Sequence, residues 1–435
     1  MKNKSLFLIF AALVIGTSSC SKIGDDVIDA TANYPLPPAN YVKSQNLTGV
    51  LKGTLKQDSI YYLTGNVAVK KGDTLAVQQG ATIIAKGNYQ FQVSGTLLCL
   101  GTEAKQITFT SNTPSKLSDV ALNKGQWGGF VFDSTAVYIY MRYTHVNYTG
   151  GPDSGGSPQA SFDVVGSQTY NGGAHIVVED CWFFGGIDDG IHLVGNISVS
   201  IKRNVIQHLG GPDGESMNMK AGLTGDISYN YIWSAANNGI KLETGKTVLI
   251  PQSKLNIYNN TIVNGGWRKV GEATNSILID KWARANIYNN VMVGNNTGIN
   301  ITTKADTANT KYGYNLIFAI NAASAPWIYP AGASSKKQPS DITGATAELC
   351  NSVFTTWIPP VTTLPDNTVT DSNVPSLKTG SPAIGKGLAT APFSYFITGS
   401  LNGKNGTADQ LNKDMGAYPT DGTGNKHLPT SQPIQ

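Results

Sequence analysis

Charged side chains are scarce in this chain of 435 residues. Lys, Arg, Asp and Glu make up 14% of the residues, and the formal net charge is only +4, where soluble domains usually carry about 25% charged residues. A charge this small excludes a general electrostatic attraction to nucleic acid. We therefore expect no nucleic-acid partner, and we expect a monomer.

Cysteine is also scarce, with four residues in the whole chain. After Cys20, only Cys99, Cys181 and Cys350 remain. Their spacing matches no metal-binding motif, so the pattern favours buried free thiols.

Long apolar runs are absent apart from one near the start, from Leu6 to Ile15 behind Lys2 and Lys4. A run of this length is too short to span a bilayer and is typical of an export signal. Small residues leading into Cys20 resemble a bacterial lipobox, which implies lipidation of Cys20 and anchoring at the outer membrane or cell surface. We expect a signal peptide over residues 1–20 and a flexible tether over 21–49. An ordinary secretory signal is the alternative.

Glycine, by contrast, is abundant, with 48 residues. Between residues 65 and 111, apolar segments of three to five residues alternate with Gly or charged turns and show no helical period. Short strands at such regular spacing indicate the coils of a solenoid.

A repeat becomes explicit between residues 176 and 302, where one polar position recurs every 24 to 30 residues. This position is occupied in turn by Asp180, Asn204, Asn230, Asn260 and Asn290. Three residues before it lie Val177, Ile201, Ile227, Ile257 and Ile287, and two residues after it lie Trp182, Ile206, Ile232, Ile262 and Met292. Since Asn tolerates left-handed backbone and its amide can both donate and accept along a stack, the pattern predicts a right-handed parallel β-helix. Trp182 is then expected in the interior.

Segments outside the repeat resemble the same fold. The motifs are Trp127-Gly128-Gly129, Ser381-Pro382-Ala383-Ile384-Gly385 and Asp414-Met415-Gly416-Ala417-Tyr418, which are similar to parts of exported bacterial β-helix proteins of the pectate-lyase-like superfamily. We expect an all-β solenoid with the β-helix over 50–304, terminal coils and an irregular capping region over 305–420, and a disordered tail over 421–435. The resemblance implies the fold and leaves the activity open, because lyases, hydrolases and adhesins share it.

The densest ionisable cluster supplies the candidate catalytic residues, which are Asp188, Asp189, His192, Glu215 and Lys220. Asp189 and Glu215 occupy one phase of neighbouring coils, about 4.8 Å apart, and like charges that close raise one pKa. The stretch from Gly185 to Ile191 also resembles the Gly-Asp-Asp motif of polygalacturonase-like glycoside hydrolases. That resemblance implies Asp188 as general acid and Asp189 as part of the pair that activates water.

A lyase uses the same face differently. Asp188, Asp189 and Glu215 could hold Ca²⁺ against a uronate carboxylate, with Lys220, Lys241 or Arg203 as the base. Ca²⁺ is therefore a candidate cofactor, and turn-forming acids without catalytic function are the alternative.

Aromatic side chains offer a binding surface. Tyr258 and Tyr288 fall at one outward phase of neighbouring coils, with Trp267 and Trp282 nearby, and exposed rings of this kind stack on sugars. Arg203 and Lys241 complete the candidate binding residues. We expect a tethered protein that binds, and in some of these interpretations cleaves, a polysaccharide, with a non-catalytic structural or adhesion protein as the alternative.

Overall fold

The computed structural model describes nine parts of the chain: residues 35–113, 126–165, 174–211, 213–245, 251–269, 272, 274–360, 371–392 and 410–429. Cys20, with the whole predicted signal peptide, lies outside these residues. In the described part, no helix is long and apolar enough to cross a membrane.

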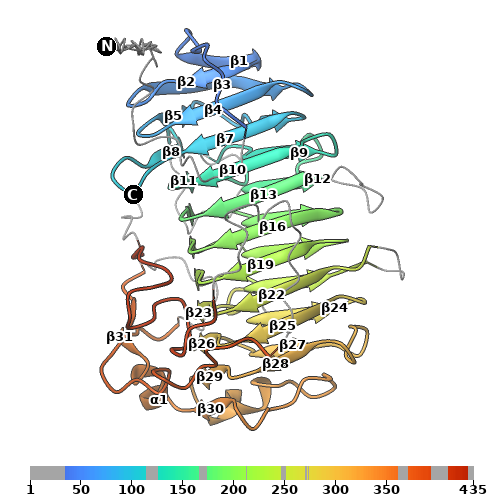
Figure 1. The fold of residues 1–435 in the computed structure, drawn as a ribbon, viewed down its shortest axis with the longest axis vertical. Coiled ribbons are helices and arrows are strands. Elements are labelled where there is room, and N and C mark those ends of the chain that lie inside the picture. Colours follow the sequence, from blue (N-terminus) through green and yellow to red (C-terminus); the bar gives the residue numbers. More distant parts are fainter. Residues whose placement is uncertain are drawn as a thin grey trace, which may run out of the picture.

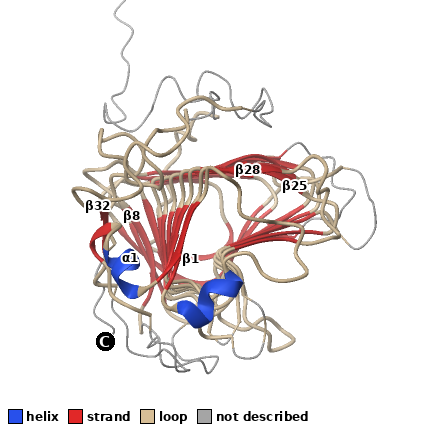
Figure 2. Cartoon of the chain, turned by 90° about the horizontal axis from the view of Figure 1, so that it is seen from below, coloured by secondary structure: helices blue, strands red, loops and turns tan. Residues whose placement is uncertain are grey.

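The described strands form coils that stack into a right-handed parallel β-helix, as predicted (Figure 1). Each full coil contributes one strand to each of three faces, which Figure 2 shows around a common interior. The first face consists of β2 (Gly53–Leu55), β4 (Thr74–Gln78), β7 (Thr96–Leu100), β10 (Tyr138–Arg142), β13 (Ala174–Glu179), β16 (Ile197–Lys202), β19 (Thr224–Ser228), β22 (Lys254–Tyr258), β25 (Arg284–Tyr288) and β28 (Lys311–Gly313).

The other two faces belong to one hydrogen-bonded sheet, because the long strand β3 (Ile60–Val69) and its neighbour β1 (Asn46–Val50) turn the corner between them. The second face continues with β5 (Thr82–Ala85), β8 (Ile107–Ser111), β11 (Thr144–Asn147), β14 (Trp182–Phe184), β17 (Val205–Gln207), β20 (Tyr231–Trp233), β23 (Thr261–Val263), β26 (Val291–Val293), β29 (Leu316–Ala319) and β30 (Ile342–Ala345). The third face continues with β6 (Phe91–Val93), β9 (Phe130–Asp133), β12 (Phe162–Val165), β15 (Ile191–Val194), β18 (Met217–Lys220), β21 (Ile240–Glu243), β24 (Ile277–Asp280) and β27 (Ile299–Ile301).

Alternate side chains of each strand fill the interior, so one continuous apolar core runs the length of the helix. On the third face, for example, Ile191 and Leu193 of β15 are fully buried, while His192 between them faces outward. The predicted free thiols are confirmed, since Cys99, Cys181 and Cys350 are buried and unpaired with one another.

An asparagine ladder links the coils where the first face turns into the second. The side-chain oxygen of Asn230 accepts from the backbone and side-chain N–H groups of Asn204, at 3.0 and 2.9 Å. Asn260 and Asn290 repeat these contacts, and the ladder continues to Asn315, whose backbone N–H donates to Asp341. The predicted role of the Asn column is therefore confirmed.

The predicted register at the start of this column is wrong by one residue. Cys181, and not Asp180, is level with Asn204, and its backbone N–H donates to the Asn204 side chain at 2.9 Å. Trp182 consequently faces outward, and Phe183 takes the interior position. Val178 replaces Val177 in the interior for the same reason.

The chain beyond β30 covers one end and one side of the β-helix. It contains α1 (Ala347–Asn351) and the antiparallel pair β31 (Phe354–Thr356) and β32 (Val374–Leu377), after the short 3-10 helix η1 (Ala322–Trp327). Residues 410–429, here called the C-terminal cover, then run back along the second face toward earlier coils (Figure 1). Met415, Ala417 and Tyr418 pack there against outward side chains of the second face.

Two predicted domain limits move. Leu47 is fully buried and lies in β1, so the first coil begins inside the segment expected as a tether. Asn425 and His427 are buried in the C-terminal cover, so this part of the expected disordered tail is packed on the helix. The apolar surface that each segment covers explains the order.

Candidate functional site

The candidate acidic site lies on the third face, at the turns that precede β15 and β18. Asp189 and Glu215 are level with each other on adjacent coils, as predicted, and both are more than nine-tenths buried. The backbone N–H of Glu215 donates to Asp189 Oδ1 at 2.6 Å. This contact fixes the two carboxyl groups side by side.

Amide and ammonium groups surround this pair. Asn218 Nδ2 donates to Asp189 Oδ2 at 2.7 Å and to Glu215 Oε2 at 3.3 Å. Glu215 Oε1 accepts from Asn238 Nδ2 at 3.1 Å and from Lys241 Nζ at 3.3 Å. Lys241 is thus the counter-ion of the acidic pair, which differs from its predicted role as a free glycan ligand.

Burial and the neighbouring negative charge shift the titration of this cluster. Burial and the charge of Asp189 raise the pKa of Glu215 to about 7. Burial raises the pKa of the half-buried Asp188 to about 6, helped by the charge of Glu215. The Lys241 pKa is raised despite burial, because Glu215 and Glu243 favour its charged form. Lys241 therefore stays protonated at neutral pH and is unsuited to act as a base.

His192 lies beside the acidic pair but contacts a different acid. Its Nδ1 is 2.8 Å from Asp163 Oδ1, the residue directly opposite it on β12. The other ring nitrogen, Nε2, is buried without a hydrogen-bond partner among the described residues. Lys220 is half-buried, level with Glu243, and within the described part of the chain no hydrogen bond or ion pair joins it to the cluster.

The predicted metal ligands do not converge on one point. Among the described residues, no group of three His, Cys, Asp or Glu side chains is placed to hold a metal ion. Both oxygens of Asp189 already accept hydrogen bonds from protein donors. The arrangement of Asp188, Asp189 and Glu215 does not fit a resident Ca²⁺ ion.

The predicted tyrosine surface is wrong in this structure. Tyr258 is completely buried and Tyr288 is 8% exposed, because Leu411 of the C-terminal cover packs against both. Trp267 is half-buried, with its indole N–H donating to Gly294 O at 2.8 Å. Of the four predicted aromatic ligands, Trp282 alone has an exposed ring, at 47%.

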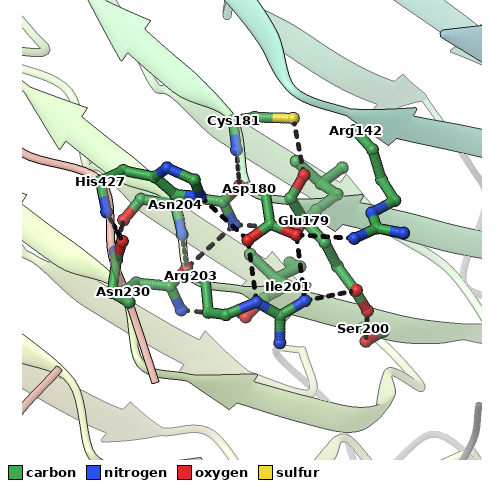
Figure 3. A network of polar contacts seen from close by, with 12 residues as sticks. Arg142, Glu179, Asp180, Cys181, Ser200, Ile201, Arg203, Asn204, Asn230 and His427 are labelled. Carbon is green, nitrogen blue, oxygen red and sulfur yellow. Dashed lines mark hydrogen bonds and ion pairs between the residues drawn. The ribbon is translucent and has the colours of Figure 1, made fainter. Parts of the chain in front are cut away.

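Arg203 belongs to a separate polar network, shown in Figure 3. Its guanidinium donates to Asp180 at 2.8 Å and to Glu179 at 2.8 Å, while Arg142 and His427 reach Asp180 from other sides. Burial opposes ionisation of Asp180, but these donors hold its pKa well below the usual range. A cavity of about 340 Å³ adjoins the network. Its contacts explain how the C-terminal cover is anchored, and they separate Arg203 from the acidic site.

Sequence reasoning missed the amides that organise the acidic pair, Asn218 and Asn238. Asn218 stands at an outward position of a strand with period two, where any polar residue is acceptable, so no signal marked it. Arg268 was also missed as part of the site. It is buried and donates to the carbonyl groups of Leu209, Gly210 and Gly211, which fixes the loop that leads into Glu215.

The coils, the parallel pairing of all three faces and the asparagine ladder define the class of the protein as a right-handed β-helix of the pectate-lyase-like kind. No protein-family model matches the chain. No curated protein matches it either.

Two solved structures resemble it. One is the PL6 family polysaccharide lyase Pedsa3628 from Pseudopedobacter saltans, with 13% identity, coverage of 69% of this chain and 88% of the lyase, and a TM-score of 0.34. The other is pectate lyase Pel9A, with 14% identity, 88% coverage of each chain and a TM-score of 0.35.

Proposed function

We propose that this protein binds and cleaves a polysaccharide at the acidic site of the third face. The observation that supports this most is the coupled pair of Asp189 and Glu215, which keeps a carboxylic acid partly protonated at neutral pH. Carboxyl groups with separated pKa values are what acid–base cleavage of a glycosidic bond requires.

The order of the two raised pKa values suggests the roles. Between about pH 6 and 7, Asp188 is ionised and Glu215 is still protonated. Glu215 would give its proton to the glycosidic oxygen as the bond to the anomeric carbon breaks. Asp188 would take a proton from the water that attacks this carbon. These roles are the reverse of those that the Gly-Asp-Asp resemblance implies for Asp188.

β-Elimination from an acidic polysaccharide is the second candidate, and the position of two lysines favours it. Lys241 stays charged beside protonated Glu215, so both could hold a uronate carboxylate and stabilise the charge that develops on it. Lys220 faces outward on the adjacent strand β18 and is the candidate base for the proton next to that carboxylate.

One assay separates the two reactions. Acidic and neutral polysaccharides are incubated with the protein lacking residues 1–20, with Ca²⁺ or with a chelator, and both reducing ends and unsaturated uronate are measured. Reducing ends without unsaturated products support hydrolysis, and unsaturated products support elimination. Binding without any product, across a broad panel, would contradict cleavage and leave a binding protein.

We also propose that the chain is exported and anchored to a membrane through a lipid on Cys20. The proposal rests on the apolar run and the small residues before Cys20. Metabolic labelling with a radioactive fatty acid should mark the unchanged protein, while Cys20→Ala should be unlabelled and released. Equal labelling of both would contradict it.

A further inference from the structure

Trp282 lies in an unusual turn at the far edge of the third face. The turn joins β24 to β25, and both Lys281 and Trp282 adopt left-handed backbone there, with φ of 45° and 66°. Bulky residues avoid this conformation, which costs conformational energy that a glycine does not incur.

Neighbouring coils show which residue the turn normally takes. Lys220, Glu243 and Asp280 are level with one another at the ends of β18, β21 and β24. Two residues further along, the equivalent positions hold Gly222 and Gly245, both with positive φ. Trp282 therefore stands in a position that glycine fills on the two preceding coils.

The strained backbone presents the indole to solvent in a fixed orientation. The backbone N–H of Trp282 donates to Lys304 O at 2.7 Å, and its carbonyl accepts from Gln252 Nε2 at 2.7 Å. The ring itself is 47% exposed, and no hydrogen bond or ring contact involves it among the described residues. Strain that is held in place around an exposed, unused side chain indicates a function for that side chain.

The position of Trp282 relates it to the acidic site. Asn275 is level with Glu215 two coils further along and comes seven residues before Trp282. With ~3.3 Å per strand residue and ~4.8 Å per coil, the two sites lie roughly 20 Å apart across the same face. An extended polymer could contact both at once, whereas a single sugar could not.

We infer that Trp282 is a distal subsite on which one sugar ring of an acidic polysaccharide stacks while the chain continues to Glu215. The inference rests on the proposed function, because it assumes that the third face binds a polysaccharide. An aromatic ring suits this role, since its face packs against the C–H groups of a pyranose at little entropic cost. Lys304, exposed beside the ring, would favour an acidic sugar.

The test compares affinities for hexamers of galacturonate and of mannuronate by calorimetry, in a Glu215→Gln background that prevents cleavage. Trp282→Gly should weaken hexamer binding about tenfold, which is the loss expected for one stacked ring. Trp282→Phe should restore most of the affinity. Trp327→Ala is the matched control, since Trp327 in η1 is 48% exposed and lies outside the third face, and it should bind as the parent does.

Thermal melting separates binding from folding. Because glycine fits the turn, Trp282→Gly should melt no lower than the parent protein while binding more weakly. Unchanged hexamer affinity in Trp282→Gly would overturn the subsite and leave the acidic site intact. Failure of the parent protein to bind either hexamer would overturn the subsite, and cleavage activity in the unsubstituted protein would then decide the proposed function separately.

Discussion

At the scale of single residues, two kinds of buried polar side chain dominate this β-helix. The asparagines of the ladder are neutral and fully satisfied, whereas Asp189 and Glu215 place two acids beside each other. The first arrangement stabilises the fold. The second costs stability when both groups are ionised, which is the usual signature of a functional site.

Asn260 should be among the least replaceable residues. Its side chain donates to Ile227 O and Asn290 Oδ1 and accepts from Asn230, all in the interior. Asn260→Ala leaves these partners unsatisfied and should lower the free energy of unfolding by about 3 kcal/mol. Denaturant titration measures this loss. Asn300, which faces outward on β27, provides the control, and an equal effect of Asn300→Ala would contradict the ladder's role.

Glu215 should make stability depend on pH. Its pKa rises from an ordinary 4.5 to about 7 in the folded protein, so the folded state holds a proton that the unfolded state releases. Stability contributed by this group is present below pH 4.5 and is lost as the pH rises through 7. Relative to Glu215→Gln, the unchanged protein should therefore lose up to about 3 kcal/mol across this window. Melting curves at several pH values test it, and parallel pH profiles of the two proteins would refute it.

At the scale of strands and segments, the sequence predicts the coils well and the outer cover poorly. The Asn column and the period-two strands specify the interior, because both depend on residues one coil apart. The single error in register arose at Cys181, whose backbone N–H joins the ladder although its side chain is not an amide. A polar Asp180 next to it drew the alignment to the wrong residue.

The buried tyrosines show why the rest was not predictable. Tyr258 and Tyr288 do stand on the outer side of the first face, where they pack under Leu411. The contact joins segments far apart in the chain: Asn259, beside Tyr258, donates to Asp414 O, 155 residues later. No local periodicity encodes such a pairing. The amides around Glu215 were missed for a related reason, since their partners lie on other coils.

Removal of the C-terminal cover should expose this apolar surface. A chain that ends after residue 409 loses Leu411, Met415 and Tyr418, which bury their side chains against the first and second faces. The expected cost is about 5 kcal/mol, from burial of three large side chains. Dye binding should rise and the melting temperature should fall. An unchanged melting temperature would show that residues 410–429 do not support the fold.

At the scale of the whole molecule, the solenoid divides its surface between structure and chemistry. The C-terminal part of the chain covers the second face over several coils, while the acidic site and Trp282 lie on the third face. Because coils stack along one axis, an uncovered face presents a long row of side chains. Such a surface suits an extended polymer better than a small molecule.

The central claim, acid–base cleavage at Glu215, is tested most directly by comparing two buried glutamates of the third face. Glu243 is 7% exposed and paired with Lys281 at 2.5 Å, much as Glu215 is 6% exposed and paired with Lys241. On the polysaccharide that the unchanged protein cleaves, Glu215→Gln should lower kcat at least a hundredfold, and Glu243→Gln should leave it within about threefold. Equal activity of Glu215→Gln and the unchanged protein would contradict the account.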